Sequence, residues 1–318
     1  MAPVSRRVLI LAVAGVLALL VFAAVLAYAF VGFLGAPRPY VALLELSGVI
    51  DYERPLLGGA ITPRDVEELV RIVERDPWAR AVVLVVNSPG GTMAAFEVYE
   101  LIKRLSSERV VVAYITGLGA SGGYLIALPA REIIAHPTAL VGSVGAVAVI
   151  TSYKGLLEKL GVNVTTVKSG DLKDVGNPYR EVRDEDLRVV EAIVRDTARL
   201  FLEKVREHRG DKIRDYTEIA RAGVYTGLEA EKLGLVDRTG TLEEAVKRAR
   251  ELANLPPDAP LVRVERKASI LDILLGGVQQ PVITPTPRKP LSVEVLLIWP
   301  LPLELAENTA ATMITVNS

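Results

Sequence analysis

A single hydroxyl stands between a predicted strand and a predicted helix in the glycine-rich stretch from Gly117 to Tyr124. The β-branched run over residues 110–116 favours a strand, and the apolar residues that follow the stretch favour a helix. Ser121 would then lie near a helix N-terminus, where free N–H groups favour developing negative charge, as at the site of a nucleophile. The alternative is structural, because serine is also a common helix N-cap.

A serine nucleophile needs a base, and the sequence offers lysine more readily than histidine. The chain has no cysteine and two histidines, His136 and His208, whose positions at the end of a strand and of a helix favour structural roles. Lys173 is the preferred candidate because glycines and a proline frame its polar loop. Lys168 and Lys154 lack that framing and remain alternatives.

The base must be neutral, which places a condition on its surroundings. An exposed lysine has a pKa of about 10.4 and is almost fully protonated at neutral pH. Burial lowers that pKa, and a shift of about three units costs roughly 4 kcal/mol. A lysine base therefore requires a site that excludes water.

The oxyanion of such a reaction needs two backbone N–H donors. Residues 88–91 (Ser-Pro-Gly-Gly) end a buried apolar run and can supply one donor, and the segment around Ser121 and Gly122 can supply the other. Ligands of α/β sheets collect at the edge where parallel strands end, so the two turns would meet there. The Pro-Gly-Gly sequence is equally consistent with a simple tight turn.

Strand and helix patterns alternate along most of the chain, which predicts an α/β fold with a mainly parallel sheet flanked by helices. The predicted strands are residues 40–50, 81–86, 110–116, 132–135 and 163–167. The predicted helices include one capped by Thr62 with Pro63 at its first position, one over residues 184–208, and one with a Thr241–Glu244 capping box.

The N-terminal segment predicts a membrane anchor. No charged residue occurs from Val8 to Pro37, which exceeds the roughly 20 residues that span a bilayer. A cleaved signal peptide is the competing interpretation, with residues 27–29 as a small-x-small site, but such apolar regions usually span about 7–15 residues. Arg6 and Arg7 before the span favour a cytoplasmic N-terminus and an extracytoplasmic remainder.

The chain of 318 residues therefore divides into a cytoplasmic tip and anchor (1–39), a catalytic domain (40–254) and a proline-rich extension (255–318). The extension contains an apolar patch at residues 295–299 and could be a packing arm, a subunit contact or a disordered tail. The net charge of −1 indicates no nucleic-acid surface. We expect no metal and no cofactor, because no motif or ligand spacing for either occurs.

A set of motifs occurs in a recognisable order along residues 40–253: Asn87–Gly91, Ala120–Tyr124, Gly142–Gly145, Lys168–Gly170 with Lys173-Asp174, Pro178–Glu181, Val224–Gly227 and Gly234–Asp237. The chain resembles the signal peptide peptidase A family of membrane-bound Ser–Lys serine proteases, in its short single-domain form. The resemblance implies a Clp protease/crotonase-like fold of repeated β-β-α units. One departure is the approach to the serine, Gly117-Leu118-Gly119, which is richer in glycine than is usual for the family.

By that resemblance Ser121 is the nucleophile and Lys173 the general base. Ser143 would orient the lysine, and Gly91 and Gly122 would line the oxyanion hole. The resemblance also implies a ring-shaped homo-oligomer, in which neighbouring subunits complete the catalytic groove.

The expected substrates are hydrophobic peptides such as remnant signal peptides, and the expected location is the cell membrane, with lipid contact through residues 8–36. Three alternatives remain at this stage. They are a stomatin-type processing protease, a crotonase-like acyl-CoA enzyme that does not need Lys173, and a non-catalytic membrane scaffold on the same fold.

Overall fold

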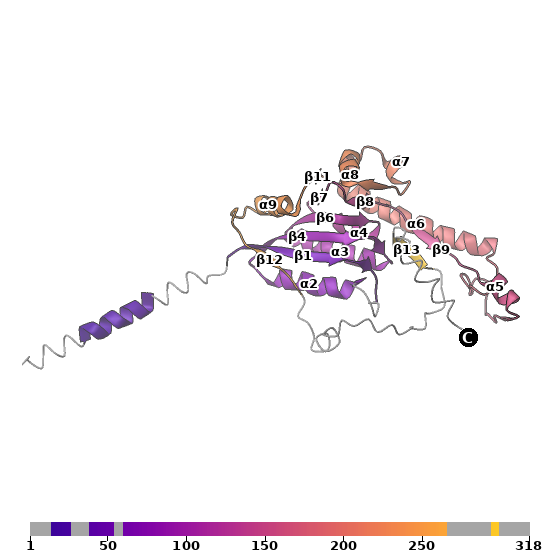
Figure 1. Ribbon diagram of the computed structural model, residues 1–318, viewed down its shortest axis with the longest axis horizontal. Helices are drawn as coiled ribbons and strands as arrows, with labels where there is room; N and C mark the ends of the chain where they lie inside the picture. Colours follow the sequence, from indigo (N-terminus) through magenta and orange to yellow (C-terminus); the bar gives the residue numbers. More distant parts are fainter. Residues whose placement is uncertain (1–13, 27–37, 54–59, 266–293, 299–318) are drawn as a thin grey trace, which may run out of the picture. The chain divides into compact units, whose positions relative to one another are not determined.

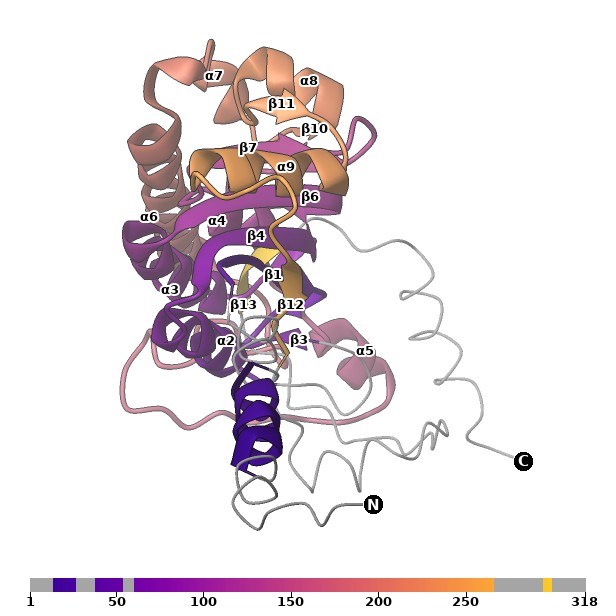
Figure 2. The same ribbon diagram turned by 90° about the vertical axis from the view of Figure 1, so that its left-hand side faces the viewer.

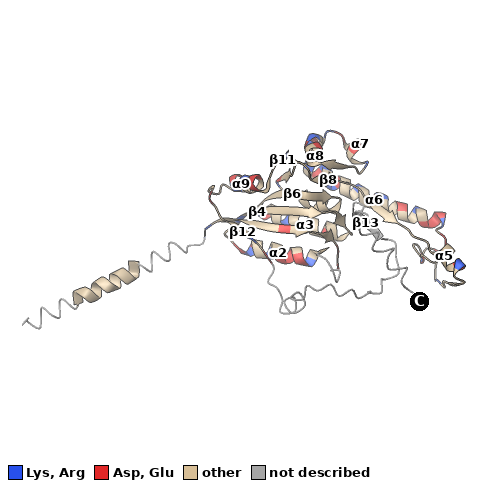
Figure 3. Cartoon of the chain, viewed as in Figure 1, with Lys and Arg blue, Asp and Glu red and all other residues tan. Residues whose placement is uncertain are grey.

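The computed structural model describes residues 14–26, 38–53 and 60–265, and the backbone of residues 294–298 (Figure 1). The chain divides into two compact units, residues 1–39 and 40–318, which we describe separately. In the first unit, residues 14–26 form a helix without charged side chains (Figure 3). Among the described residues, no helix has both the length and the apolarity to cross a bilayer. Much of the anchor predicted at residues 8–36 lies outside the described part of the chain.

A mainly parallel sheet forms the centre of the second unit, as predicted. Its main path runs β10-β8-β6-β4-β1-β12, with β7 beside β6 and β11 beside β7. The pairs are parallel except for β10 with β8. The strands are β1 Tyr40–Ser47, β4 Ala79–Ser88, β6 Val110–Ala120, β7 Glu132–Ala135, β8 Leu140–Gly142, β10 Val224–Thr226, β11 Arg238–Thr239 and β12 Leu261–Arg263.

Helices cover both faces of this sheet, which explains why its central strands are apolar throughout (Figure 2). On β1, Ala42 and Leu44 join the core under α2, α3 and α4, whereas Val41 and Leu43 pack with α9 on the opposite face. The helices are α2 Pro63–Arg75, α3 Ala94–Glu108, α4 Gly122–Ala127, α5 Lys154–Lys159, α6 Asp184–Arg209, α7 Tyr216–Ile219, α8 Gly227–Leu233 and α9 Leu242–Leu252.

The predicted helix starts are confirmed where the capping chemistry is explicit. The Thr62 hydroxyl accepts a hydrogen bond from the N–H of Asp65 at 3.2 Å, with Pro63 in the first turn of α2. Thr241 and Glu244 form the capping box of α9. These local contacts orient the helices that cover the sheet.

A second, smaller sheet lies across the carboxyl ends of the main strands, in the order β3-β2-β5-β13-β9. Its strands are β2 Val49–Ile50, β3 Ala60–Ile61, β5 Gly90–Gly91, β9 Val147–Val149 and β13 Glu294–Ile298. β2 and β5 directly follow β1 and β4, so the chain runs β1-β2-β3-α2 and then β4-β5-α3, and only the second passage has the expected β-β-α order because β3 precedes α2.

The prediction of a strand at residues 163–167 is wrong. This segment is irregular and exposed, with Val167 94% accessible. Its β-branched residues favour an extended backbone, but among the described residues no strand pairs with it to satisfy its hydrogen bonds. Beyond the last predicted helix, β12 pairs with β1 and adds residues 261–263 to the sheet.

Candidate active site

Ser121 occupies a strained and buried junction between β6 and α4. Its φ and ψ are 54° and −123°, and it is 1% exposed. Its N–H donates to the carbonyl of Gly142 at 2.8 Å, and its own carbonyl accepts from the N–H groups of Tyr124 and Leu125. Within the described residues its side chain makes no capping bond, so the N-cap interpretation does not account for the hydroxyl. A positive φ at a non-glycine residue costs about 1–3 kcal/mol and is concentrated at functional sites.

Glycines allow the serine turn to lie directly against β5. A Cβ on Gly122 would lie 3.2 Å from the Cα of Gly90, 3.4 Å from the nitrogen of Gly91 and 2.8 Å from the Cβ of Ala95. A Cβ on Gly91 would lie 1.8 Å from the carbonyl oxygen of Ile50. The two segments expected to supply oxyanion donors are therefore in contact, although close packing alone already requires both glycines.

The register of β8 places Ser143 at the same edge. Ala120 pairs with Gly142, so Ser121 and Ser143 each follow one member of this pair. Ser143 is half-buried and also has a positive φ, of 53°, and its N–H donates to the carbonyl of Gly223 at 2.7 Å. Two serines in strained conformations thus follow adjacent parallel strands.

Lys173 is exposed, in contrast to the buried Ser121. It belongs to the segment between α5 and α6, where its side chain is exposed and its N–H donates to the carbonyl of Gly170 at 3.1 Å. Within the described residues, the side chain of this lysine is therefore not enclosed in the water-free site that a lysine base requires.

The alternative lysines are bound to carboxylates. Lys168 donates to Asp174 at 2.7 Å, and Lys154 forms ion pairs with Glu181 and Glu158 at 3.1 and 3.5 Å. The hydrogen bond to Glu181 raises the pKa of Lys154, which favours its protonated form. Both are poorer candidates for a neutral base than Lys173.

An ionic network holds the loop that carries Lys173. Arg180 donates to Asp174 at 2.7 Å and also to Asp186, in the first turn of α6. Hydrogen bonds from Arg180 and Lys168 lower the pKa of Asp174 to about 2. The network fixes the backbone next to Lys173 although the side chain of Lys173 faces solvent.

Asp186 is the residue of this network that the sequence analysis did not identify. It is 1% exposed and accepts from the side chain of Arg183 at 2.8 Å and from its N–H at 3.0 Å. Hydrogen bonds from Arg180 and Arg183 hold the pKa of this carboxyl well below its usual range. Its position in an acidic first helical turn, three residues after Arg183, was the available signal.

The two histidines occupy structural positions in the described chain. The Nε2 atom of His208 lies 2.8 Å from the Tyr99 hydroxyl, and burial lowers the pKa of His208. The Nδ1 atom of His136 lies 2.9 Å from the Thr138 hydroxyl. Neither histidine has a hydrogen bond to Ser121 within the described residues.

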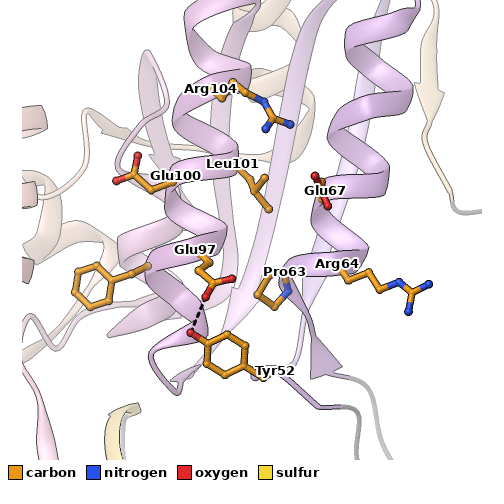
Figure 4. Close-up of a pocket in the computed structure, with 9 residues that line it drawn as sticks. Tyr52, Pro63, Arg64, Glu67, Glu97, Glu100, Leu101 and Arg104 are labelled. Carbon is orange, nitrogen blue, oxygen red and sulfur yellow. Dashed lines mark hydrogen bonds between the residues drawn. The ribbon is translucent and has the colours of Figure 1, made fainter.

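A groove of about 690 Å³ lies elsewhere, between α2 and α3 (Figure 4). Its lining includes Tyr52, which donates to Glu97 at 2.9 Å, and charged residues of both signs. It does not include the serine turn. Among the described residues, no group of three or more acidic, histidine or cysteine side chains is arranged to hold a metal ion.

Comparison with known proteins identifies the family. Residues 103–256 match the model of Peptidase family S49. A provisionally named protease of Methanocaldococcus jannaschii is 40% identical over 184 residues, covering 58% of this chain and 59% of that protein. Another, from Synechocystis, is 32% identical and covers 78% of this chain and 87% of that protein. Serine protease SPPA of Arabidopsis thaliana is 30% identical and covers 77% of this chain, but 37% of that longer protein.

Among solved structures, a variant of the 1510-N membrane-bound stomatin-specific protease matches 72% of this chain and 99% of that chain. The identity is 15% and the TM-score 0.45, which is too low to support an argument about activity. The family model and the sequence relatives carry the assignment instead. The chain belongs to peptidase family S49.

Proposed function

We propose that this protein is a serine endopeptidase that uses a Ser121–Lys173 dyad. The observation that carries the proposal is the conformation of Ser121, which is buried at a positive φ and packed through Gly122 against the Gly90–Gly91 turn. Strain of this kind at a strand-to-helix turn persists when it positions a reactive hydroxyl. Membership in a peptidase family gives the reaction class.

The Ser121 hydroxyl attacks the scissile carbonyl, while neutral Lys173 takes its proton. The N–H groups of Gly91 and Gly122 stabilise the oxyanion, and Ser143 orients the amine of the lysine. The lysine then returns the proton to the leaving amine, and water hydrolyses the acyl-enzyme. The contact of Gly122 with the Gly90–Gly91 turn, and the pairing of Ala120 with Gly142 next to Ser143, support the roles of the two glycines and of Ser143.

The lysine acts across a subunit boundary in this proposal. Lys173 is exposed on a braced loop, whereas Ser121 is buried at the edge of the sheet. Apolar side chains are also exposed on the segment between β9 and α6, including Val162, Val164, Val167 and Leu172. Covering this segment with a second copy would remove water from around the lysine and favour the neutral amine that the reaction needs. A ring-shaped homo-oligomer supplies that copy.

We further propose that residues 8–36 anchor the protein in the cell membrane, with the N-terminus in the cytoplasm and the catalytic domain outside. The absence of charge over this segment supports the proposal. Hydrophobic peptides such as remnant signal peptides are the proposed substrates.

Mixing two inactive variants tests the shared site. Ser121→Ala and Lys173→Ala should each lack peptidase activity on an apolar fluorogenic peptide in detergent. After co-refolding, a mixed assembly contains sites with Ser121 from one copy and Lys173 from another, so part of the activity should return. A labelled-chain experiment checks that the two variants co-assemble. If the mixed assembly forms but regains no peptidase activity, a lysine supplied by a second copy is contradicted. Full activity in either variant alone would refute the dyad.

A further inference from the structure

The C-terminal strand β13 pairs with two short strands, β5 and β9, and Figure 1 shows it beside β9. It is antiparallel to β5 and also to β9, although β5 and β9 are not paired with each other. The pairs are Ile298 with Gly90, Leu297 with Gly91, Leu296 with Val147, Val295 with Ala148 and Glu294 with Val149. The tail therefore pairs with both strands in succession, with residues 294–296 along β9 and residues 297–298 along β5.

Both of these edges belong to the site. β5 is the Gly90–Gly91 turn that contacts Gly122, and β9 begins four residues after Ser143. An extended peptide binds a protein most simply by adding a strand to free edges, where main-chain hydrogen bonds give affinity. Adjacent strands lie about 4.8 Å apart, so a strand edge already paired with β13 cannot pair with a second strand on that side. A peptide that reaches the oxyanion turn along these edges must take the place of β13.

We infer that residues 294–298 are an intramolecular competitor that occupies the peptide-binding groove and must leave before a substrate binds. The inference rests on the proposed function, because it assigns this groove to a peptidase. The segment has the chemistry of the proposed substrates, since four apolar residues, Val-Leu-Leu-Ile, follow Glu294. This gives the apolar patch at residues 295–299 a role.

Covalent attachment favours the tail over a free peptide. Residues 266–293 connect β12 to β13 in the same chain, and a tethered segment acts at an effective concentration in the millimolar range. A substrate at micromolar concentration would compete poorly. Delivery of substrate at high local concentration, or withdrawal of the tail, would then control the rate.

Proline substitution in the full-length protein tests this inference. Neighbouring N–H groups along a strand point to opposite sides, so Leu296→Pro/Leu297→Pro removes a donor toward each of the two edges. Ala310→Pro/Ala311→Pro introduces the same pair of adjacent prolines outside β13 and serves as the control. The rate of hydrolysis of an apolar fluorogenic peptide, well below its KM, is compared for the three proteins, with thermal unfolding as a check on folding.

The double-proline variant should cleave at least about five times faster than the wild type, and the control variant should match the wild type. A synthetic peptide of residues 292–299 at millimolar concentration should then slow the variant, whereas the same peptide with proline at both positions should not. Equal rates in all three folded proteins would overturn the inference, as would a slower double-proline variant. If the proposed function itself is wrong, the result is different, because none of the three proteins would then show peptide cleavage that is abolished by Ser121→Ala.

Discussion

Replacing Gly123 by alanine would force the serine turn away from the strand beneath it. The new Cβ would lie 2.3 Å from the carbonyl oxygen of Ser88 and 3.1 Å from its Cβ. A backbone oxygen cannot rotate aside, so either the turn or the end of β4 must move by about 1 Å. Overpacking of this kind costs roughly 1–3 kcal/mol, and a gain of about 1 kcal/mol from alanine in a helix offsets part of it. We expect a net loss of about 1 kcal/mol.

The effect on the reaction should exceed the effect on stability. A displacement of about 1 Å at a catalytic group costs on the order of 100-fold in rate. Urea unfolding measures the stability, and the rate of Ser121 modification by a fluorophosphonate, followed by intact mass, measures the reactivity. Gly117→Ala is the matched control, because its Cβ would meet the end of the Asn87 side chain at 3.2 Å and that side chain can move. A Gly123→Ala variant that matches the wild type in both measurements would refute the proposed close packing.

Two further predictions concern the charged residues. Asp237→Asn leaves Arg209, which is 4% exposed, without its carboxylate partner and should cost about 3–5 kcal/mol in urea unfolding at pH 7. Burial raises the pKa of Asp237, but the hydrogen bond and charge of Arg209 together with the hydrogen bonds from Lys212 and the N–H of Ile133 outweigh it, so the pKa is lowered overall. The stabilisation is therefore complete above the ordinary aspartate pKa of about 3.9 and is lost as the pH falls through the folded-state pKa. A difference in unfolding free energy between wild type and variant that stays constant into acid would contradict this. Asp186→Asn should lower kcat about tenfold because it loosens the loop of Lys173, and it should also lower stability because Arg180 and Arg183 lose a buried carboxylate partner. Exposed Asp184→Asn should change neither, and an equal kcat of the two folded variants would rule out a positioning role for Asp186.

The serine turn shows what local sequence predicts well. A β-branched strand, a glycine-rich turn and an apolar helix are all short-range features, and the structure has them at β6, Ser121 and α4. The helix starts at Thr62 and Thr241 follow from capping chemistry within three residues. Even so, the sequence is also consistent with a simple N-cap at Ser121. Only the backbone angles show that the conformation of this serine is strained.

Features that depend on distant partners were less predictable. The segment at residues 163–167 has the composition of a strand but lacks a pairing edge in the described chain. Asp186 belongs to the site loop through Arg180, which a helical pattern does not reveal. The pairing of β13 with β5 and β9 joins residues about 150 to 200 positions apart, for which the sequence gives no register.

Active-site labelling of the full-length protein tests the central claim most directly. The protein in detergent is incubated with a fluorophosphonate, and the adduct is located by intact mass and peptide mapping in the wild type, in Ser121→Ala and in Lys173→Ala. The account predicts one adduct per chain at Ser121, absent from the serine variant and strongly reduced in the lysine variant. No adduct on the folded, assembled wild type, or an adduct on a different residue, would contradict the assignment of Ser121 as the nucleophile.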